Sequence, residues 1–469
     1  MMREILARSY KDLPSHHLRS CFLYLASFPE DYVIDVSDLI ELWIAESFIP
    51  HTRSHKLEET ARNYVSELAQ RSLVQVVDRS KVHGWIEKIR VHDILSDWCI
   101  EKAREDGFLD VIDKTTGQKG ASSSDTTRVY RYSYQNLRSD SLEAAPCWVR
   151  TVVCFGLTSV SIPKLRFLRV LHIQNSRLEN LPSAIGGCIH VRCLRLRNCE
   201  SVTLPSSIGQ LLYLQTLDLR GTLLDSEVAR SIWDITTLRH VFLQNGFRPP
   251  ALARSKRQQR QTELQTLVLG LPFVATKKTY ADMVIFLGQM NQLTTLNLPM
   301  RNIPGGMINI VEKMPDLVDA YISRFGMLDK LPAKFPESLQ RLVLEADNLT
   351  QDPMPTLEKL PCLVVLELTG HTGETISCSN KGFPRLQKLK LGDFRGEWNM
   401  AVGAMPKLSH LLLSKYSNLD GLPQALLHIR YLSYIRLTSM PWITEHNDST
   451  LKKLLLKGCE VKRDDFLVI

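Results

Sequence analysis

Three arginines are the residues of this chain whose types and spacing most clearly suggest a binding site. Arg195, Arg197 and Arg220 stand beside the inner leucines of two successive L-x-L motifs, and Arg197 and Arg220 occupy equivalent positions 23 residues apart. Because side chains alternate along a strand, all three should point out of one face of a sheet. Guanidinium groups on neighbouring strands repel one another unless they meet carboxylates, which they bind in bidentate pairs. The three arginines must therefore meet carboxylates; the alternative is a solvated basic face.

Residues typical of catalysis or metal binding show no comparable pattern. The ten cysteines contain no C-x-x-C pair, which argues against a zinc site or a redox motif. No nucleophile–base pair or paired carboxylates occur at a meaningful spacing. The sequence also lacks G-x-x-x-x-G-K-[ST], the loop that cradles nucleotide phosphates. We therefore predict that the chain is not an enzyme, holds no metal and carries no cofactor of its own.

A repeated L-x-x-L-x-L pattern dominates the chain from residue 168 to residue 459. Nine of the twelve spacings between its thirteen copies are 22 to 24 residues. Repeats of this length combine one short strand with a return segment, and stacked copies bury their apolar faces jointly. The copies open at Leu168, Val191, Leu214, Leu238, Leu264, Leu293, Leu317, Leu339, Leu363, Leu386, Leu408, Leu432 and Leu451. The pattern predicts an α/β leucine-rich-repeat solenoid of about thirteen repeats with a long strand surface free to bind macromolecules.

The N-terminal residues 1–110 predict a small α+β domain of the winged-helix type. Apolar periodicity indicates helices over 18–28, 36–48 and 57–73, strands over 74–77 and 86–91, and a closing helix that runs from Asp93, its expected cap, to residue 105. Polar, small residues follow this domain from residue 111 and indicate a linker. We therefore assign residues 1–110 to the winged helix, 111–145 to a linker and the start of the solenoid, and 146–469 to the solenoid.

Charge is divided unevenly between these parts. Residues 1–110 hold 14 Lys/Arg and 19 Asp/Glu, which leaves 44 and 31 of the chain's 58 and 50 for residues 111–469. An acidic domain and a basic solenoid should attract each other across a shared interface. No run of about 18 apolar residues is present, so we expect no membrane span. Scattered cysteines and an N-terminus without a secretory signal favour the cytoplasm, with the nucleus or the inner face of the plasma membrane as alternatives.

Two segments of the N-terminal domain and the style of the repeats resemble a known family. The segments are Cys21 to Tyr32 (CFLYLASFPEDY) and Leu42 to Glu46 (LWIAE), and Val91-His92-Asp93 is similar to a Met-His-Asp motif. The return segments LPSAIG at 181–186 and LPSSIG at 204–209 follow the same style. In this order they resemble plant nucleotide-binding leucine-rich-repeat disease-resistance proteins of the coiled-coil type. The coiled-coil domain and nucleotide-binding core of that family are missing here, so we expect a truncated form.

The resemblance implies roles for individual residues. In the family, the histidine of the Met-His-Asp motif contacts the β-phosphate of ADP, which would make His92 a nucleotide ligand and Asp93 its support. We expect this only where a nucleotide-binding core is supplied elsewhere, so ADP or ATP is implied for a full-length receptor alone. The family also has an arginine cluster that meets an acidic motif of the coiled-coil domain, and Arg195, Arg197 and Arg220 would be that cluster.

The implied function is recognition and autoinhibition in plant innate immunity. The solenoid would sense a pathogen effector or a guarded host protein, and the winged helix would relay the state to hypersensitive-response signalling. Possible partners include the coiled-coil and nucleotide-binding domains of a receptor. Two alternatives stay open: a leucine-rich-repeat scaffold or substrate adaptor, and DNA binding by the winged helix. The acidic balance of residues 1–110 disfavours nucleic acid, because duplex binding depends on cations that neutralise phosphates.

Overall fold

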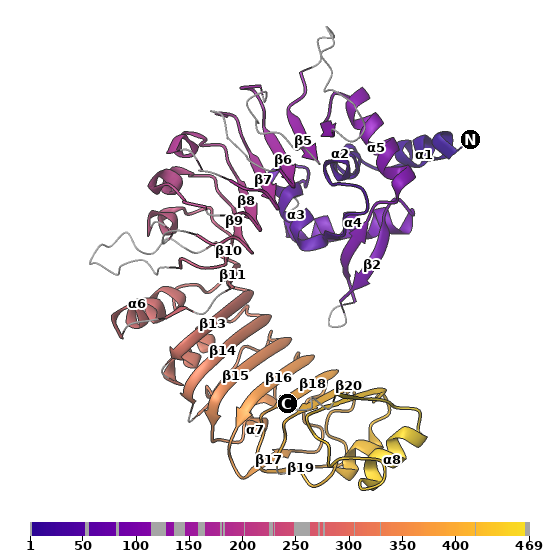
Figure 1. Ribbon diagram of the computed structural model, residues 1–469, viewed down its shortest axis with the longest axis vertical. Helices are drawn as coiled ribbons and strands as arrows, with labels where there is room; N and C mark the ends of the chain where they lie inside the picture. Colours follow the sequence, from indigo (N-terminus) through magenta and orange to yellow (C-terminus); the bar gives the residue numbers. More distant parts are fainter. Residues whose placement is uncertain are drawn as a thin grey trace. The chain divides into compact units, whose positions relative to one another are not determined.

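The computed structural model shows an α+β domain followed by stacked parallel strands, which pack as two compact units, Met1–Arg248 and Pro249–Ile469 (Figure 1). We describe each unit by itself. The structure describes residues 2–51, 56–80, 84–113, 128–135, 146–157, 165–178, 181, 183–200, 202–224, 228, 230–247, 263–270, 273–274, 277–303, 305–328, 330–417 and 419–464. Within them, every helix is too short or too polar to span a bilayer.

The first unit begins with the predicted winged helix. Its helices are α1 (Met2–Lys11), α2 (His16–Tyr24), α3 (Val36–Ala45), α4 (Leu57–Gln70) and α5 (Asp93–Glu105). Its small antiparallel sheet has the order β1 (Ile34–Asp35), β3 (Ile86–Arg90), β2 (Gln75–Arg79). The first predicted helix is shorter than expected, because α2 passes into a 3-10 turn over Leu25–Ser27 ahead of Pro29.

A run of parallel strands follows α5 in the same unit. It comprises β4 (Asp110–Asp113), β5 (Arg131–Gln135), β6 (Thr151–Phe155), β7 (Val170–Gln174), β8 (Cys193–Arg197), β9 (Thr216–Leu219) and β10 (His240–Leu243). The repeat leucines stand in register: Leu171 pairs with Leu194, and Leu194 with Leu217, and all three are fully buried. Return segments contain 3-10 helices at Ser183–Gly187, Ser206–Gln210 and Arg230–Asp234.

The winged helix and the first repeats share one hydrophobic core. Its largest fully buried side chain is Trp43 of α3, and the core extends to Val153, Val170 and Cys193 of strands β6, β7 and β8. Aromatic rings continue this contact, with Phe155 of β6 lying 6.0 Å from Phe28, measured between ring centroids. Helix α3 therefore packs on the strands rather than standing apart from them.

The second unit also contains a ladder of parallel strands. The strands are β11 (Thr266–Leu269), β12 (Phe273–Val274), β13 (Thr295–Ile303), β14 (Asp319–Leu328), β15 (Arg341–Leu349), β16 (Val365–His371), β18 (Lys388–Gly392), β20 (His410–Ser414), β21 (Tyr434–Thr438) and β22 (Glu460–Asp464). A separate pair, β17 (Thr375–Cys378) and β19 (Glu397–Met400), lies on the return side. The helical segments are α6 (Lys277–Leu287), Gly305–Lys313, α7 (Met354–Leu357), Gln424–His428 and α8 (Ser449–Leu456).

Two details of the predicted repeats differ in the structure. The sheet begins before the first L-x-x-L-x-L copy, since β4 and β5 lie within or beside the range 111–145 and pair with the ladder without leucines. The prediction of a thirteenth repeat strand at Leu451 is wrong, because Leu451 lies in α8 and the last strand starts at Glu460. The L-x-x-L spacing also suits one face of a helix, and Asp448 caps α8 by accepting from the Leu451 N–H at 2.9 Å.

Candidate functional site

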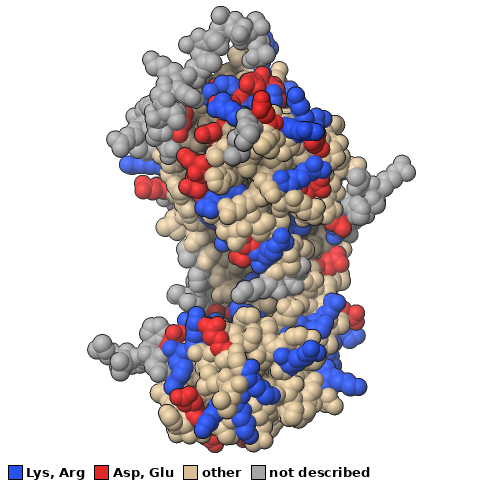
Figure 2. Space-filling view, turned by 90° about the vertical axis from the view of Figure 1, so that its right-hand side faces the viewer, with Lys and Arg blue, Asp and Glu red and all other residues tan. Residues whose placement is uncertain are grey.

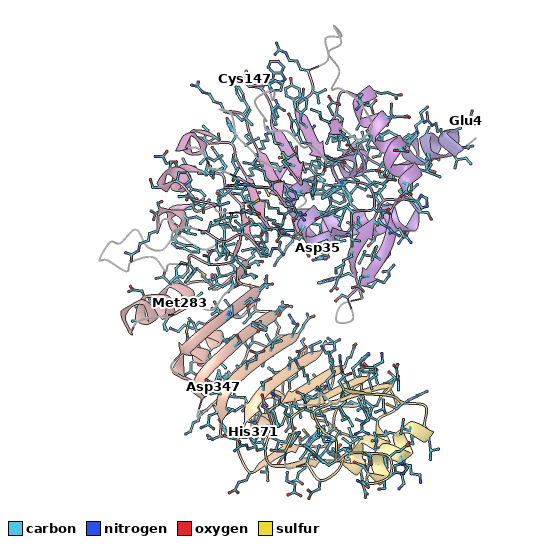
Figure 3. The ribbon with its side chains drawn as sticks, viewed as in Figure 1. Glu4, Asp35, Cys147, Met283, Asp347 and His371 are labelled. Atoms are coloured by element: carbon cyan, nitrogen blue, oxygen red, sulfur yellow. The ribbon has the colours of Figure 1, made fainter. Side chains whose placement is uncertain are left out.

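Helix α3 directs two carboxylates toward the strands of the first unit. Asp35, labelled in Figure 3, caps the helix by accepting from the backbone N–H groups of Ser37 and Asp38. Leu39, Leu42 and Trp43 are fully buried and fix the helix on the core. Asp38 and Glu41 are one turn apart, so they project from one face of the helix. That face meets β8 and β9.

Arg195 of β8 forms the centre of the resulting ion-pair network. Its side chain has no solvent exposure, and its guanidinium donates to the Glu41 carboxylate at 2.5 Å and to the backbone carbonyl of Asp38 at 3.0 Å. The Asp218 carboxylate of β9 lies 3.4 Å from the Arg195 Nε atom. A buried guanidinium is tolerated only when it is paired in this way.

Arg197 and Arg220 converge on the same acids. Arg197 donates to Asp38 at 2.7 Å and to Asp218 at 2.6 Å. Arg220 donates to each of these two carboxylates at 2.7 Å, and its guanidinium lies 4.1 Å from the centre of the Phe242 ring. Three guanidinium groups thus face three carboxylates, and the predicted repulsion along the arginine row is cancelled by acids of this chain.

Burial sets the protonation of this network. It raises the pKa of Glu41 and that of Asp218 to about 7, and the Arg195 and Arg197 guanidinium groups act against that rise. His172, one strand earlier, is fully enclosed; desolvation, followed by the charges of Arg195 and Arg197, lowers its pKa well below the usual value. His172 is therefore a neutral imidazole at the edge of the network.

Further polar contacts join the winged helix to strands on both sides of the network. Glu46 accepts from Arg131 of β5 at 2.9 Å and from the hydroxyl of Thr151. The backbone carbonyl of Ser27 accepts from Ser133 at 2.7 Å. Arg239, directly before β10, lies 2.7 Å from Glu58 of α4. The acidic domain and basic strands thus meet through specific pairs, as their opposite net charges predict.

The Val-His-Asp segment stands at the beginning of α5. His92 occupies the position before the helix and is exposed, and its backbone carbonyl accepts from Ser96 at 2.9 Å. Asp93 is the first helical residue and not the cap that the sequence predicts; its charge near the helix N-terminus is favourable through the helix dipole. One exposed imidazole and one helix start do not by themselves fit ADP, since the sequence supplies no phosphate loop.

The sequence prediction named the three arginines but missed their partners. Asp38 and Glu41 gave only a local signal, two acids on one face of a helix. Asp218 could have been found: it stands 23 residues after Arg195, and the two pair directly in the β8–β9 register. An acid at that position indicates that the arginine row is neutralised within the solenoid.

Comparisons with known proteins agree with this architecture. Residues 28–99 match the disease resistance protein winged helix domain family, and residues 148–314 and 256–440 match a leucine-rich repeat region family. The chain is 30% identical over 491 residues to probable disease resistance RPP8-like protein 2 of Arabidopsis thaliana, covering 93% of this chain and 52% of that protein. It is 29% identical to probable disease resistance protein RF9 of the same plant, covering 89% and 44%.

The chain thus spans about half the length of these relatives. Among solved structures, a leucine-rich-repeat protein of Leptospira interrogans aligns with a TM-score of 0.49 at 20% identity, over 71% of this chain and 90% of that chain.

Proposed function

Because this chain belongs to the plant disease-resistance proteins with a winged helix domain and a leucine-rich-repeat region, we propose that it is the recognition and autoinhibition module of an innate immune receptor. The repeats would bind a pathogen effector or a guarded host protein. The winged helix would pass the resulting change to the nucleotide-binding and coiled-coil domains of a receptor. We propose no enzymatic activity for the chain itself.

The observation that supports this proposal best is the buried network between α3 and strands β8 and β9. Removing one member of a buried ion pair typically costs 3–5 kcal/mol, because it leaves an uncompensated charge. The network is also joined to a continuous core that includes Trp43 and Cys193. A displacement of these strands is therefore transmitted to the winged helix, as a relay requires.

The arginine row has a second possible role in the same receptor. Arg195 is enclosed, but the side chain of Arg220 is 38% exposed. Arg220 is thus the member most able to meet an acidic segment of a coiled-coil domain while the network stays intact. His92 would contact ADP only with a phosphate loop from a nucleotide-binding domain.

DNA binding is the weaker proposal. Residues 1–110 carry more acids than bases, and one face of α3 is occupied by the strands. Basic and acidic side chains also lie interspersed among the described residues of the surface shown in Figure 2. Duplex binding requires a concentrated cationic surface.

Co-expression tests the proposed function. The chain is expressed in leaf cells with the part of RPP8-like protein 2 that it does not match, and association and cell death are scored. We expect the chain to co-precipitate with that part and to reduce cell death, and Asp38→Lys to weaken the restraint. Glu101→Lys, which changes an exposed acid paired with Arg3, is the matched control. No association and unchanged cell death would overturn the proposal.

A further inference from the structure

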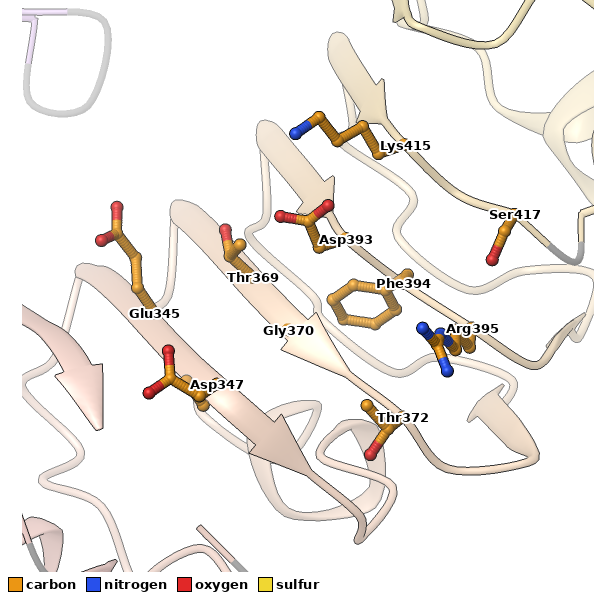
Figure 4. A pocket seen from close by; sticks show the side chains of 11 residues that line it. Glu345, Asp347, Thr369, Gly370, Thr372, Asp393, Phe394, Arg395, Lys415 and Ser417 are labelled. Carbon is orange, nitrogen blue, oxygen red and sulfur yellow. The ribbon is translucent and has the colours of Figure 1, made fainter. Parts of the chain in front are cut away.

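The second unit contains a pocket of about 520 Å³ at the ends of four neighbouring ladder strands (Figure 4). Ligand pockets commonly measure 300–1,000 Å³. The lining comes from β15, β16 and the turns that follow β16, β18 and β20: Glu345, Ala346, Asp347, Thr369, Gly370, Thr372, Asp393, Phe394, Arg395, Lys415 and Ser417. It is separate from the α3 network, which lies in the other unit.

The pocket has a firm apolar and backbone base. Phe394 is 1% exposed and stacks on His371 at 5.1 Å between ring centroids. Gly370 has a φ of +89°, and a Cβ atom there would lie 1.7 Å from the backbone oxygen of Ala346. Only glycine permits this close approach of β16 to β15. The hollow is thus built by residues that cannot easily collapse into it.

Charged side chains of both signs line the pocket. Glu345 and Asp347 stand on β15, Asp393 and Arg395 follow β18, and Lys415 follows β20. Figure 4 shows the two β15 acids on one side of Phe394 and Arg395 on the other, with Asp393 between Thr369 and Lys415. Asp393 and Lys415 have positive φ angles of 49° and 51°. Asn198 after β8 and Ser439 after β21 have the same conformation, with φ angles of 49° and 54°, so this turn belongs to the repeat and places Asp393 and Lys415 at matching positions.

These charges lack the partners that neighbouring charges have. Elsewhere in this ladder the structure pairs Arg341 with Asp319, Lys388 with Glu367 and Arg436 with Asp464 across adjacent strands. In the described part of the chain no ion pair is formed by Asp347, Asp393, Arg395 or Lys415, and Glu345 has only a 3.4 Å hydrogen bond from Tyr321. The pocket therefore presents the acids of β15 and, farther along the ladder, Arg395 and Lys415 with Asp393 beside them, and none of these groups is held in an ion pair among the described residues.

We propose that this pocket binds an extended peptide segment of a protein partner that carries a cationic and an anionic side chain about four residues apart. The inference rests on the proposed function, since it identifies where the solenoid reads a partner. Three strand steps of about 4.8 Å separate the acidic strand from Lys415, or about 14 Å, and an extended chain advances about 3.3 Å per residue. The cationic side chain lies at Glu345 and Asp347, and the anionic one at Arg395 and Lys415.

Calorimetric titration of the full chain tests the inference with blocked peptides. The probe is acetyl-Lys-Ser-Gly-Ser-Asp-amide, and its comparison peptides replace either the lysine or the aspartate by alanine. We expect the probe to bind at least about tenfold more tightly than either comparison, the factor that corresponds to 1.4 kcal/mol. Glu345→Gln with Asp347→Asn should remove the preference for lysine only, and Arg395→Gln with Lys415→Gln the preference for aspartate only.

Matched controls use exposed charges of the same unit outside the pocket. Asp420→Asn with Glu445→Gln, and Lys407→Gln with Lys452→Gln, should leave all three affinities unchanged. The inference would be overturned if the chain bound the three peptides with equal affinity, or if the pocket variants kept the same preferences as the unaltered chain. Free lysine or aspartate binding as tightly as the probe would overturn it in favour of a small-molecule site. If the peptides do not bind while the chain still reduces cell death caused by the co-expressed part of RPP8-like protein 2, only the pocket inference is lost. If the chain does not reduce that cell death, the proposed function itself is lost.

Discussion

Replacing Glu41 by leucine should destabilise the first unit strongly, because Arg195 would then be buried without its closest carboxylate. The two side chains are 7% and 0% exposed and lie 2.5 Å apart. A guanidinium group cannot release its proton in a protein, so the substitution leaves three guanidinium groups facing only two carboxylates, those of Asp38 and Asp218. We expect a loss of about 3–5 kcal/mol. For a unit of this size, about 2–4 °C per kcal/mol gives a fall in Tm of roughly 6–20 °C.

Arg195→Met should cost less than Glu41→Leu below neutral pH. Burial already raises the pKa of Glu41 to about 7, so without Arg195 that carboxyl becomes neutral by taking up a proton. The double variant Glu41→Leu with Arg195→Met removes both charges and should recover most of the stability lost in Glu41→Leu.

The measurement is thermal unfolding of the full chain, with hydrogen exchange of α3 to assign the transition to the first unit. Glu101→Leu is the matched control, since the Arg3–Glu101 pair is exposed and should contribute less than about 1 kcal/mol. A double variant whose loss equals the sum of the two single losses would show that the charges are not coupled, and the reasoning would be refuted.

Three further outcomes are expected. Burial lowers the pKa of His240 to about 4, so the folded chain should lose up to about 3 kcal/mol of stability as pH falls from 6.5 towards 4, because the unfolded chain takes up the proton first. His240→Gln should flatten that part of the plot of stability against pH, and an unchanged plot would contradict the assignment. Gly370→Ala should cost more than about 1 kcal/mol in urea unfolding and weaken probe binding, because the added methyl meets the Ala346 carbonyl; wild-type stability would contradict the close approach. Leu451→Ala should cost about 2–5 kcal/mol, whereas Leu456→Ala should change stability by less than about 0.5 kcal/mol, since these helix α8 residues are 1% and 80% exposed; equal losses would favour the strand predicted there.

Periodic burial explains which parts of the fold are predictable from the sequence. Leu171, Leu194 and Leu217 recur because every strand must cover the same core, so their spacing reveals the repeat and its register. This spacing is misleading at Leu451, because over six residues the L-x-x-L-x-L pattern fits one face of a helix as well as a repeat strand. It also fails at β4 and β5, because strands covered by the winged helix need not carry leucines.

The site depends on contacts between distant segments, which a local pattern does not reveal. Arg195 and Glu41 are 154 residues apart in the chain. Nothing near either residue specifies the other, although unpaired arginines in a row indicate that acids must be close. The pairing of the arginines with α3 follows from how the winged helix packs on β8 and β9, and that packing depends on apolar residues such as Trp43.

The shared network also restricts how segments of such proteins can be exchanged. Repeats are often treated as interchangeable modules, yet the rungs that contain Arg195 and Asp218 are matched to Asp38 and Glu41 of α3. A chimera that joins a foreign winged helix to these rungs would place mismatched charges in a sealed space. Residues 36–45 and 193–220 should therefore be transplanted together, and crossover points that keep the network intact lie outside the interval they enclose.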